Sequence, residues 1–153
     1  MLALGLSFAA LVLIADQATK MVVLANLEGP VEVTPFFNLV RVWNTGVSFG
    51  LFGSAGASAA WVLSGLALAV VIGLTVWLSR TAEKPAAIGL GLVIGGALGN
   101  VVDRIRFGAV FDFLDFHAFG VHWPAFNIAD AAIVVGAAVL LVDGLLLERR
   151  RST

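Results

Sequence analysis

A run from Gly53 to Ser79 without a charged residue constrains the fold more than any other feature of the chain. A transmembrane helix needs about 20 consecutive apolar residues, and this run is longer. Trp61 and Trp77 lie near its ends, about 24 Å apart along a helix, as is typical of residues at the two membrane interfaces. We therefore expect a membrane-spanning helix over 55–79.

The composition supports a membrane protein. Of the 153 residues, 60% are hydrophobic and 12% are charged, whereas a soluble domain carries about 25% charged residues. A chain of this length cannot bury so much apolar surface in one core, so the surplus has to contact lipid. The net charge of −1 gives no electrostatic reason to expect a nucleic-acid partner. Because cysteine is absent, disulfides, thiolate catalysis and cysteine-based metal sites are excluded.

Three further apolar segments predict a single membrane domain over 1–153 with four spans. Besides 55–79, the expected spans are about 2–24, 85–103 and 127–147. Pro85 is a natural first residue of a helix. The segment from Met1 to Ala15 lacks the basic start of a cleavable signal peptide, and its helical pattern continues beyond it.

Four crossings place both termini on one side of the membrane. Arg80, Lys84, Arg149, Arg150 and Arg151 lie on that side, and Lys20, Arg41, Arg104 and Arg106 lie on the other. Because basic residues are enriched in cytoplasmic segments, we expect both termini in the cytoplasm.

The segments between the spans differ in character. Val31–Val33 and Phe37–Trp43 show the alternation and the β-branched or aromatic content of short strands, and Asn44–Gly46 is typical of a turn. We expect a strand segment over about 28–52 and an outer helix or loop over about 105–126. The predicted fold is therefore mainly α and integral to the membrane, with a small β-sheet on the outer surface.

Polar residues gather where the spans meet this outer surface. They are Asp16, Lys20, Asn100, Asp103, Arg104, Asn127 and Asp130, joined by Asp112 in the outer loop. A charged residue at the bilayer centre costs about 2.5–3.5 kcal/mol, so such residues usually have a function or a partner. Asp16 and Lys20 have the i, i+4 spacing of an ion pair. Asp103 beside Arg104 fits a structural pair equally well, and Asn100 and Asn127 fit hydrogen bonds between helices.

Asp112 and Asp130 differ from these because neither has an adjacent cation. Two like charges about 4 Å apart repel by roughly 4 kcal/mol at an effective dielectric of 20, so a facing pair tends to share one proton. Such a dyad contains a base that activates water and an acid that protonates the group under attack. A proton relay, as in a small proton-coupled transporter or channel subunit, and purely structural acids are alternatives at this point.

Other chemistries have weaker support. His117 and His122 lie in an aromatic loop with a spacing that only weakly indicates metal ligands, and no phosphate-binding glycine loop is present. Gly91, Gly95 and Gly99 recur every four residues, which predicts close helix packing and no chemistry. We expect neither a metal nor another cofactor.

Five sequence blocks resemble those of the lipoprotein signal peptidases, also called signal peptidase II, in the order of that family. The blocks are Asp16–Lys20, Asn44–Gly50, Gly95–Arg104, Val110–Phe113 and Phe126–Asp130. Together they cover essentially the whole chain. One departure is visible, since no basic residue precedes the first span, as it does in many relatives.

The resemblance implies an enzyme of the bacterial inner membrane with its site near the periplasmic face. It would cleave prolipoproteins that carry diacylglycerol on a cysteine, just before that cysteine, and without a metal. Its partners would be these substrates, membrane phospholipid and inhibitors of the globomycin type. The resemblance implies catalysis by Asp112 and Asp130, a substrate site lined by Asn44, Asn100, Arg104 and Asn127, and support from Asp16, Lys20 and Asp103.

Overall fold

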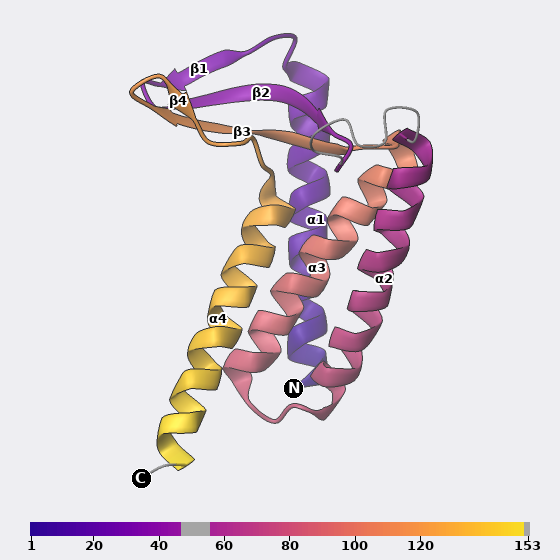
Figure 1. Cartoon of the computed structure of the whole chain (residues 1–153), viewed down its shortest axis with the longest axis vertical. Coiled ribbons are helices and arrows are strands. Elements are labelled where there is room, and N and C mark those ends of the chain that lie inside the picture. Colours follow the sequence, from indigo (N-terminus) through magenta and orange to yellow (C-terminus); the bar gives the residue numbers. More distant parts are fainter. Residues whose placement is uncertain (47–55, 152–153) are drawn as a thin grey trace.

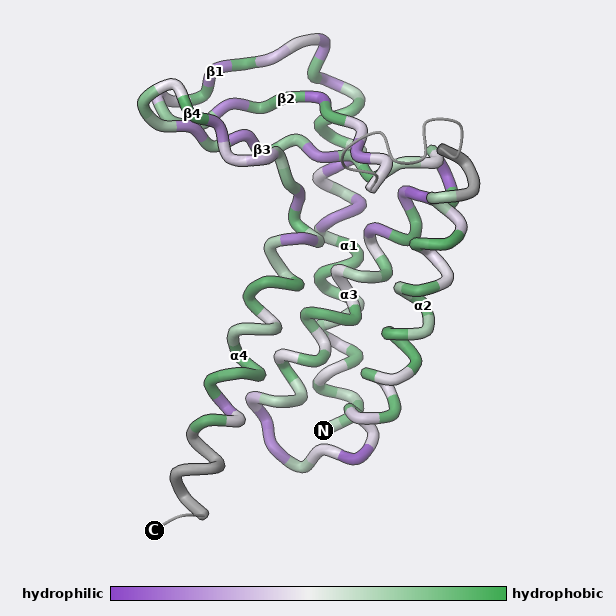
Figure 2. The backbone as a smooth tube through the Cα atoms, viewed as in Figure 1, coloured by the Kyte–Doolittle hydropathy of each residue, from purple (hydrophilic) through white to green (hydrophobic). Residues whose placement is uncertain are grey.

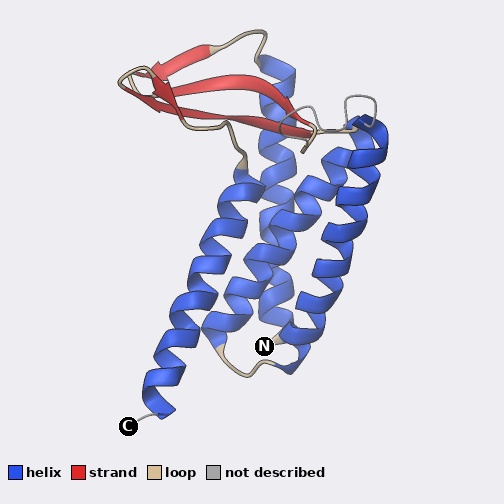
Figure 3. Cartoon of the chain, in the orientation of Figure 1, coloured by secondary structure: helices blue, strands red, loops and turns tan. Residues whose placement is uncertain are grey.

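The structure, a computed structural model, describes residues 1–46 and 56–151, without the side chains of 56–58 and 146–151. Four long helices form a bundle that carries a small antiparallel sheet at one end, here called the sheet end (Figures 1 and 3). In chain order the elements are α1 Leu2–Asn26, β1 Val31–Thr34, β2 Phe37–Asn44, α2 Gly56–Arg80, α3 Lys84–Phe107, β3 Val110–Ala118, β4 Val121–His122 and α4 Ile128–Arg151. All four helices are long and apolar enough to cross a membrane. This confirms the expected mainly α membrane fold.

Helix α3 is central, because α1, α2 and α4 all pack against it. Its glycines allow these close approaches. A Cβ atom at Gly95 would clash with the backbone of Ala9 in α1, and one at Gly96 would clash with the backbone of Ala129 in α4. The regular glycine spacing in this helix therefore serves packing against two neighbours.

The outward faces of the helices are apolar. Ile14, Val62 and Leu141 are each between 67% and 70% exposed, which suits contact with lipid. Trp61 and Trp77 are also exposed near the two ends of α2. Figure 2 shows that hydrophobic residues dominate the middle of the bundle, while hydrophilic residues gather at the sheet end and in the connection between α2 and α3.

The sheet has the strand order β1-β2-β3-β4, and all neighbours are antiparallel. Strands β1 and β2 occupy the expected strand segment, whose part from 47 to 52 lies outside the described residues. The structure differs from the helix or loop expected over 105–126, where β3 and β4 are found. Strand β3 is buried on both faces from Val110 to Phe113. The alternation of polar and apolar residues that marks a strand with one solvent face could therefore not identify it.

Candidate active site

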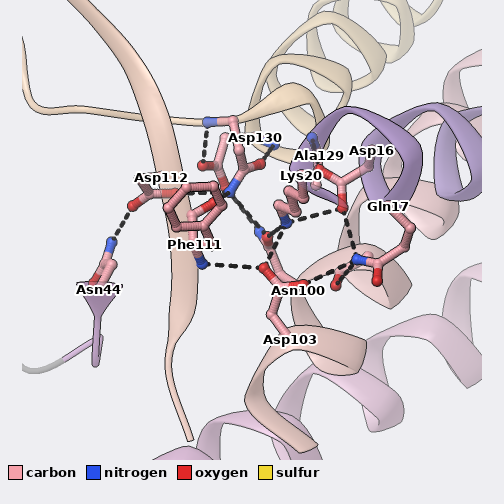
Figure 4. Close-up of polar contacts among 12 residues, drawn as sticks. Asp16, Gln17, Lys20, Asn44, Asn100, Asp103, Phe111, Asp112, Ala129 and Asp130 are labelled. Carbon is pink, nitrogen blue, oxygen red and sulfur yellow. Dashed lines mark hydrogen bonds and ion pairs between the residues drawn. The ribbon is translucent and has the colours of Figure 1, made fainter. Parts of the chain in front are cut away.

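The polar residues expected to meet do so at the sheet end, although they come from five elements (Figures 1 and 4). Asp16 and Lys20 are in α1, Asn44 ends β2, Asn100, Asp103 and Arg104 are in α3, Asp112 is in β3, Asn127 immediately precedes α4, and Asp130 is in its first turn. They form two adjoining groups. We call Asp16, Gln17, Lys20 and Asp103 the charged cluster, and Asp112 with Asp130 the dyad.

Lys20 is the centre of the charged cluster. Its Nζ lies 2.8 Å from Oδ2 of Asp16 and 2.7 Å from Oδ2 of Asp103, and all three side chains are at most 3% exposed. Gln17 Nε2 donates hydrogen bonds to both carboxylates, at 3.1 Å to Asp16 and 2.9 Å to Asp103. The i, i+4 pair expected from the sequence is therefore present, with a second acid attached.

The charged cluster also holds the backbone that carries the dyad. The N–H of Phe111 donates to Oδ2 of Asp103 at 3.0 Å, and the N–H of Ala129 donates to Oδ1 of Asp16 at 3.0 Å. Each donor immediately precedes one aspartate of the dyad. The cluster therefore fixes β3 and α4 relative to each other at the two positions that set the spacing of the dyad.

Asn127 connects the two aspartates of the dyad. Its side-chain Nδ2 donates to Oδ1 of Asp112 at 2.7 Å, and its backbone N–H donates to Oδ2 of Asp130 at 3.2 Å. The N–H of Asp130 donates in return to Oδ1 of Asn127 at 2.9 Å. This reciprocal pair is a capping box at the start of α4. Asn127 is fully buried. Through these bonds, this one residue holds both carboxylates in place.

Two more asparagines bond the remaining carboxylate oxygens. Asn44 Nδ2 donates to Oδ2 of Asp112 at 3.0 Å, and Asn100 Nδ2 donates to Oδ1 of Asp130 at 2.8 Å. The amide of Asn44 is oriented by the N–H of Gly46, which donates to its Oδ1 at 2.8 Å, and Gly46 has the positive φ of 74° that suits glycine. All four oxygens of the dyad are thus bonded by amide groups.

The electrostatics of Asp112 bring its titration closer to neutral pH. Burial raises the pKa of Asp112 to about 6. The hydrogen bond from Asn44 opposes that shift, whereas the negative charge of Asp130 adds to it. The dyad therefore contains one carboxyl group that is poised between its two protonation states.

Arg104 lies beside the dyad on the same helix as Asn100. Its side chain is half-buried, and its Nε finds no hydrogen-bond partner within the described part of the chain. Its guanidinium lies close to Gly46, since a Cβ atom added at Gly46 would be 3.7 Å from Nη2 of Arg104. A buried donor without a partner is costly, so it is available to a bound group.

His117 and His122 lie away from the dyad, on β3 and β4, where their rings stack at 4.7 Å. His122 Nδ1 lies 2.9 Å from Asp115, and this bond, helped by one from Asn38, holds the pKa of Asp115 below its usual value. No group of three or more potential metal ligands occurs in residues 1–46 and 56–151.

Sequence reasoning missed Gln17, which bonds both acids of the charged cluster. The available signals were its place as an amide between Asp16 and Lys20 and its inclusion in the Asp16–Lys20 block. It also missed the two backbone donors, because a backbone N–H leaves no mark in the sequence.

Known proteins resemble this chain over nearly its whole length. The family model of signal peptidase (SPase) II matches residues 8–146. Among curated proteins, the lipoprotein signal peptidase of Methylobacterium sp. (strain 4-46) is 47% identical, with 97% of this chain and 93% of that protein covered. The lipoprotein signal peptidase of Rhodopseudomonas palustris (strain TIE-1) is 44% identical, with coverage of 94% and 92%.

Two solved structures, both described as bacterial membrane enzymes determined in meso, share the fold. One, at 2.3 Å resolution, has a TM-score of 0.81 and 28% identity, and the match covers 97% of this chain and 91% of that one. The other, at 1.9 Å resolution, has a TM-score of 0.79 and 29% identity, with 92% of each chain covered. With the family model and the curated relatives, these similarities show that the chain belongs to the signal peptidase II family of membrane aspartic peptidases.

Proposed function

We propose that this protein removes the signal peptide from diacylglyceryl-modified prolipoproteins by cleaving before the lipidated cysteine, with Asp112 and Asp130 as the catalytic pair. The observation that carries the proposal is the bonding of both carboxylates to Asn127, which holds them side by side at the end of the bundle. A signal peptide is itself an apolar helix, so it can reach this level from within the bilayer.

In the proposed reaction, Asp130 is the base. Its carboxylate accepts bonds from Asn100 and from the backbone of Asn127, and it lies in the first turn of α4, where the helix dipole favours a negative charge. It takes a proton from water as the water oxygen attacks the carbonyl carbon of the peptide bond. Asp112 begins protonated and donates its proton to the carbonyl oxygen. Asp130 then passes the proton that it took from water to the nitrogen, and the C–N bond breaks as the tetrahedral intermediate collapses. One hydroxyl proton of the intermediate returns to Asp112, which leaves a carboxylic acid, an amine and the dyad in its starting state.

The other site residues receive proposed roles from their burial. Asn44 is exposed at the edge of the dyad, and Arg104 offers its Nε, which has no partner among the described residues, so both contact substrate directly. Asn100 lines the site while it orients Asp130. Asn127 is fully buried and positions both aspartates. Asp16, Lys20 and Asp103 support the site through the two backbone bonds described above.

The test is to replace each aspartate by asparagine. Asp112→Asn or Asp130→Asn removes an acid or a base from the pair, so we expect cleavage to fall by roughly 10³-fold or more. The measurement is the gel shift of a diacylated precursor, with and without globomycin. Asp143→Asn, in the same helix near its opposite end, is the matched control and keeps full activity. More than a few per cent of activity in both dyad variants would discard this mechanism.

Family membership and the four helices support a multi-pass protein of the bacterial inner membrane. We further propose that both termini are cytoplasmic and that the dyad faces the periplasm. The chain contains no cysteine, so a single cysteine at Ser79 gives an unambiguous label. Ser79 is exposed at the end of α2 away from the sheet, and reaction of this cysteine from the periplasmic side would reverse the assigned orientation.

A further inference from the structure

A cavity lies beside α1 and α3, where both helices approach the sheet. Its volume is about 310 Å³, at the lower end of the roughly 300–1,000 Å³ of small-molecule pockets. Met21, Leu24 and Ala25 of α1 line one wall, and Phe107 and Phe111 line the other. Gln17, Lys20 and Asp103 of the charged cluster also line the cavity. Lys20 donates to Oδ1 of Asn100 at 3.4 Å, and Asn100 in turn bonds Asp130 of the dyad.

Two arginines lie at the edge of this cavity. Arg106 lines the cavity, and its guanidinium lies 4.9 Å from the ring centroid of Phe107. Arg41 reaches from β2 and donates to the backbone oxygen of Leu24 in the wall. Neither arginine forms an ion pair with a carboxylate of the described segments. Arg106 also donates to Oε1 of Gln17 at 3.4 Å. The oxygens that these two arginines bond among the described residues are thus uncharged, and both positive charges at the cavity can attract an anionic ligand.

The walls of the cavity continue onto an exposed apolar surface that is suited to contact with lipid. Trp43 of β2 packs against Phe107 at 5.2 Å and Phe111 at 5.1 Å between ring centroids, which makes an aromatic backing for the cavity. On α1, Met21 belongs to a helical face that includes Ile14, and both are more than half exposed. An aromatic residue beside arginines at the end of an apolar helix face is the usual composition of a membrane interface.

We propose that this cavity binds an anionic phospholipid of the surrounding bilayer. The phosphodiester lies between Arg41 and Arg106, and an acyl chain follows the apolar face of α1. A guanidinium is well suited to phosphate because its N–H groups form a planar fork. The exposed apolar face continuous with the cavity favours a lipid over a free phosphate ion, which would leave that face without a partner. The proposal does not depend on the proposed function.

The test is a lipid titration of the full chain in detergent, followed by native mass spectrometry. The probe is dioleoyl phosphatidylglycerol. An arginine near an anionic lipid contributes about 1 kcal/mol, so we expect Arg41→Gln and Arg106→Gln each to weaken binding roughly fivefold, and the double variant to weaken it further. Arg80→Gln, which removes an exposed cation at the opposite end of the bundle, leaves binding unchanged. Ala25→Trp fills the cavity without changing its charge and also weakens binding.

Two matched ligands identify what is recognised. Dioleoylglycerol has the same acyl chains without phosphate, and we expect much weaker binding than for the phospholipid. Inorganic phosphate at the same concentration does not displace the lipid. Equal binding of dioleoylglycerol, displacement by inorganic phosphate, or wild-type binding by the double arginine variant would each overturn the proposal. Thermal unfolding in lipid-free detergent shows that the variants compared are folded.

Discussion

The charged cluster and the dyad lie at the same end of the bundle, and each contains two buried or half-buried carboxylates. They differ in what compensates the negative charge. In the charged cluster, Lys20 lies within 2.8 Å of both acids. In the dyad, the hydrogen-bond donors are the amides of asparagines and one backbone N–H.

We propose that this difference separates a structural role from a catalytic one. Lys20 forms ion pairs with both carboxylates of the cluster, and these carboxylates also accept hydrogen bonds from the backbone of β3 and α4. Neutral amides orient the carboxylates of the dyad without supplying a counter-charge, and burial raises the pKa of Asp112 to about 6. One group therefore fixes geometry while the other keeps a transferable proton. The following predictions test that division.

The largest effect on stability is expected from Lys20→Met. Removing one partner of a buried ion pair leaves uncompensated charge and typically costs about 3–5 kcal/mol. We expect a large loss of thermal stability in detergent, together with loss of activity, because both backbone supports of the dyad depend on the acids. Lys84→Met, at an exposed position on the opposite side of the bundle, is the control and changes little. A variant as stable as wild type would remove the structural role from the cluster.

A smaller effect is expected from Gly99→Ala. A Cβ atom there would lie 2.6 Å from Oδ2 of Asp16 and 3.3 Å from the side chain of Ala129. Such overpacking typically costs about 1–3 kcal/mol, and it displaces the acid that bonds Ala129. We expect a lower unfolding temperature and reduced cleavage. Gly65→Ala, which has open space around it in α2, is the matched control, and equal behaviour of the two variants would contradict the close packing at Gly99.

Asn44→Ala is expected to change the pH dependence of cleavage. The bond from Asn44 lowers the pKa of Asp112 against the effect of burial, so its removal raises that pKa further. Asp112 then keeps its proton to higher pH, and the alkaline limb of kcat/KM moves to higher pH, with a reduced maximum. The profile is measured with a lipidated precursor. Asn38→Ala, which removes the amide bonded to Asp115 on the same sheet, leaves the limb in place. A shift to lower pH in Asn44→Ala would contradict the assignment of Asp112 as the acid.

The smallest effect is expected at the far end of the sheet. Because the folded pKa of Asp115 is depressed, its contribution to stability is present above its ordinary value near 4 and is lost as the pH falls through the folded value. His122 is 54% exposed, so the contribution is at most about 1 kcal/mol. Protection factors for amide hydrogen exchange in the β3–β4 hairpin, which correct for the intrinsic slowing of exchange in acid, are expected to fall on acidification in the wild type and to lose this dependence in Asp115→Asn. The same acid dependence in both proteins would exclude Asp115 as its source.

Much of the architecture was predictable from local sequence. Apolar runs of sufficient length gave the four helices, and β-branched alternation gave β1 and β2, because both signals depend on neighbours in the chain. The gathering of acids at one end followed from the alternation of crossings. The lack of an adjacent cation set Asp112 and Asp130 apart from the other acids, and the resemblance to a known family then implied that they are catalytic.

The sequence alone thus determined a four-helix membrane protein with its acids at one end. Only the tertiary structure decided which acid receives a lysine and which receives an amide. Ala129 and its acceptor Asp16 are 113 residues apart, and Gln17 and Asp103 are 86 apart. Hydropathy depends on adjacent residues, whereas a hydrogen bond depends on atoms within about 3 Å of each other. That proximity exists only after α3 has packed against α1 and α4.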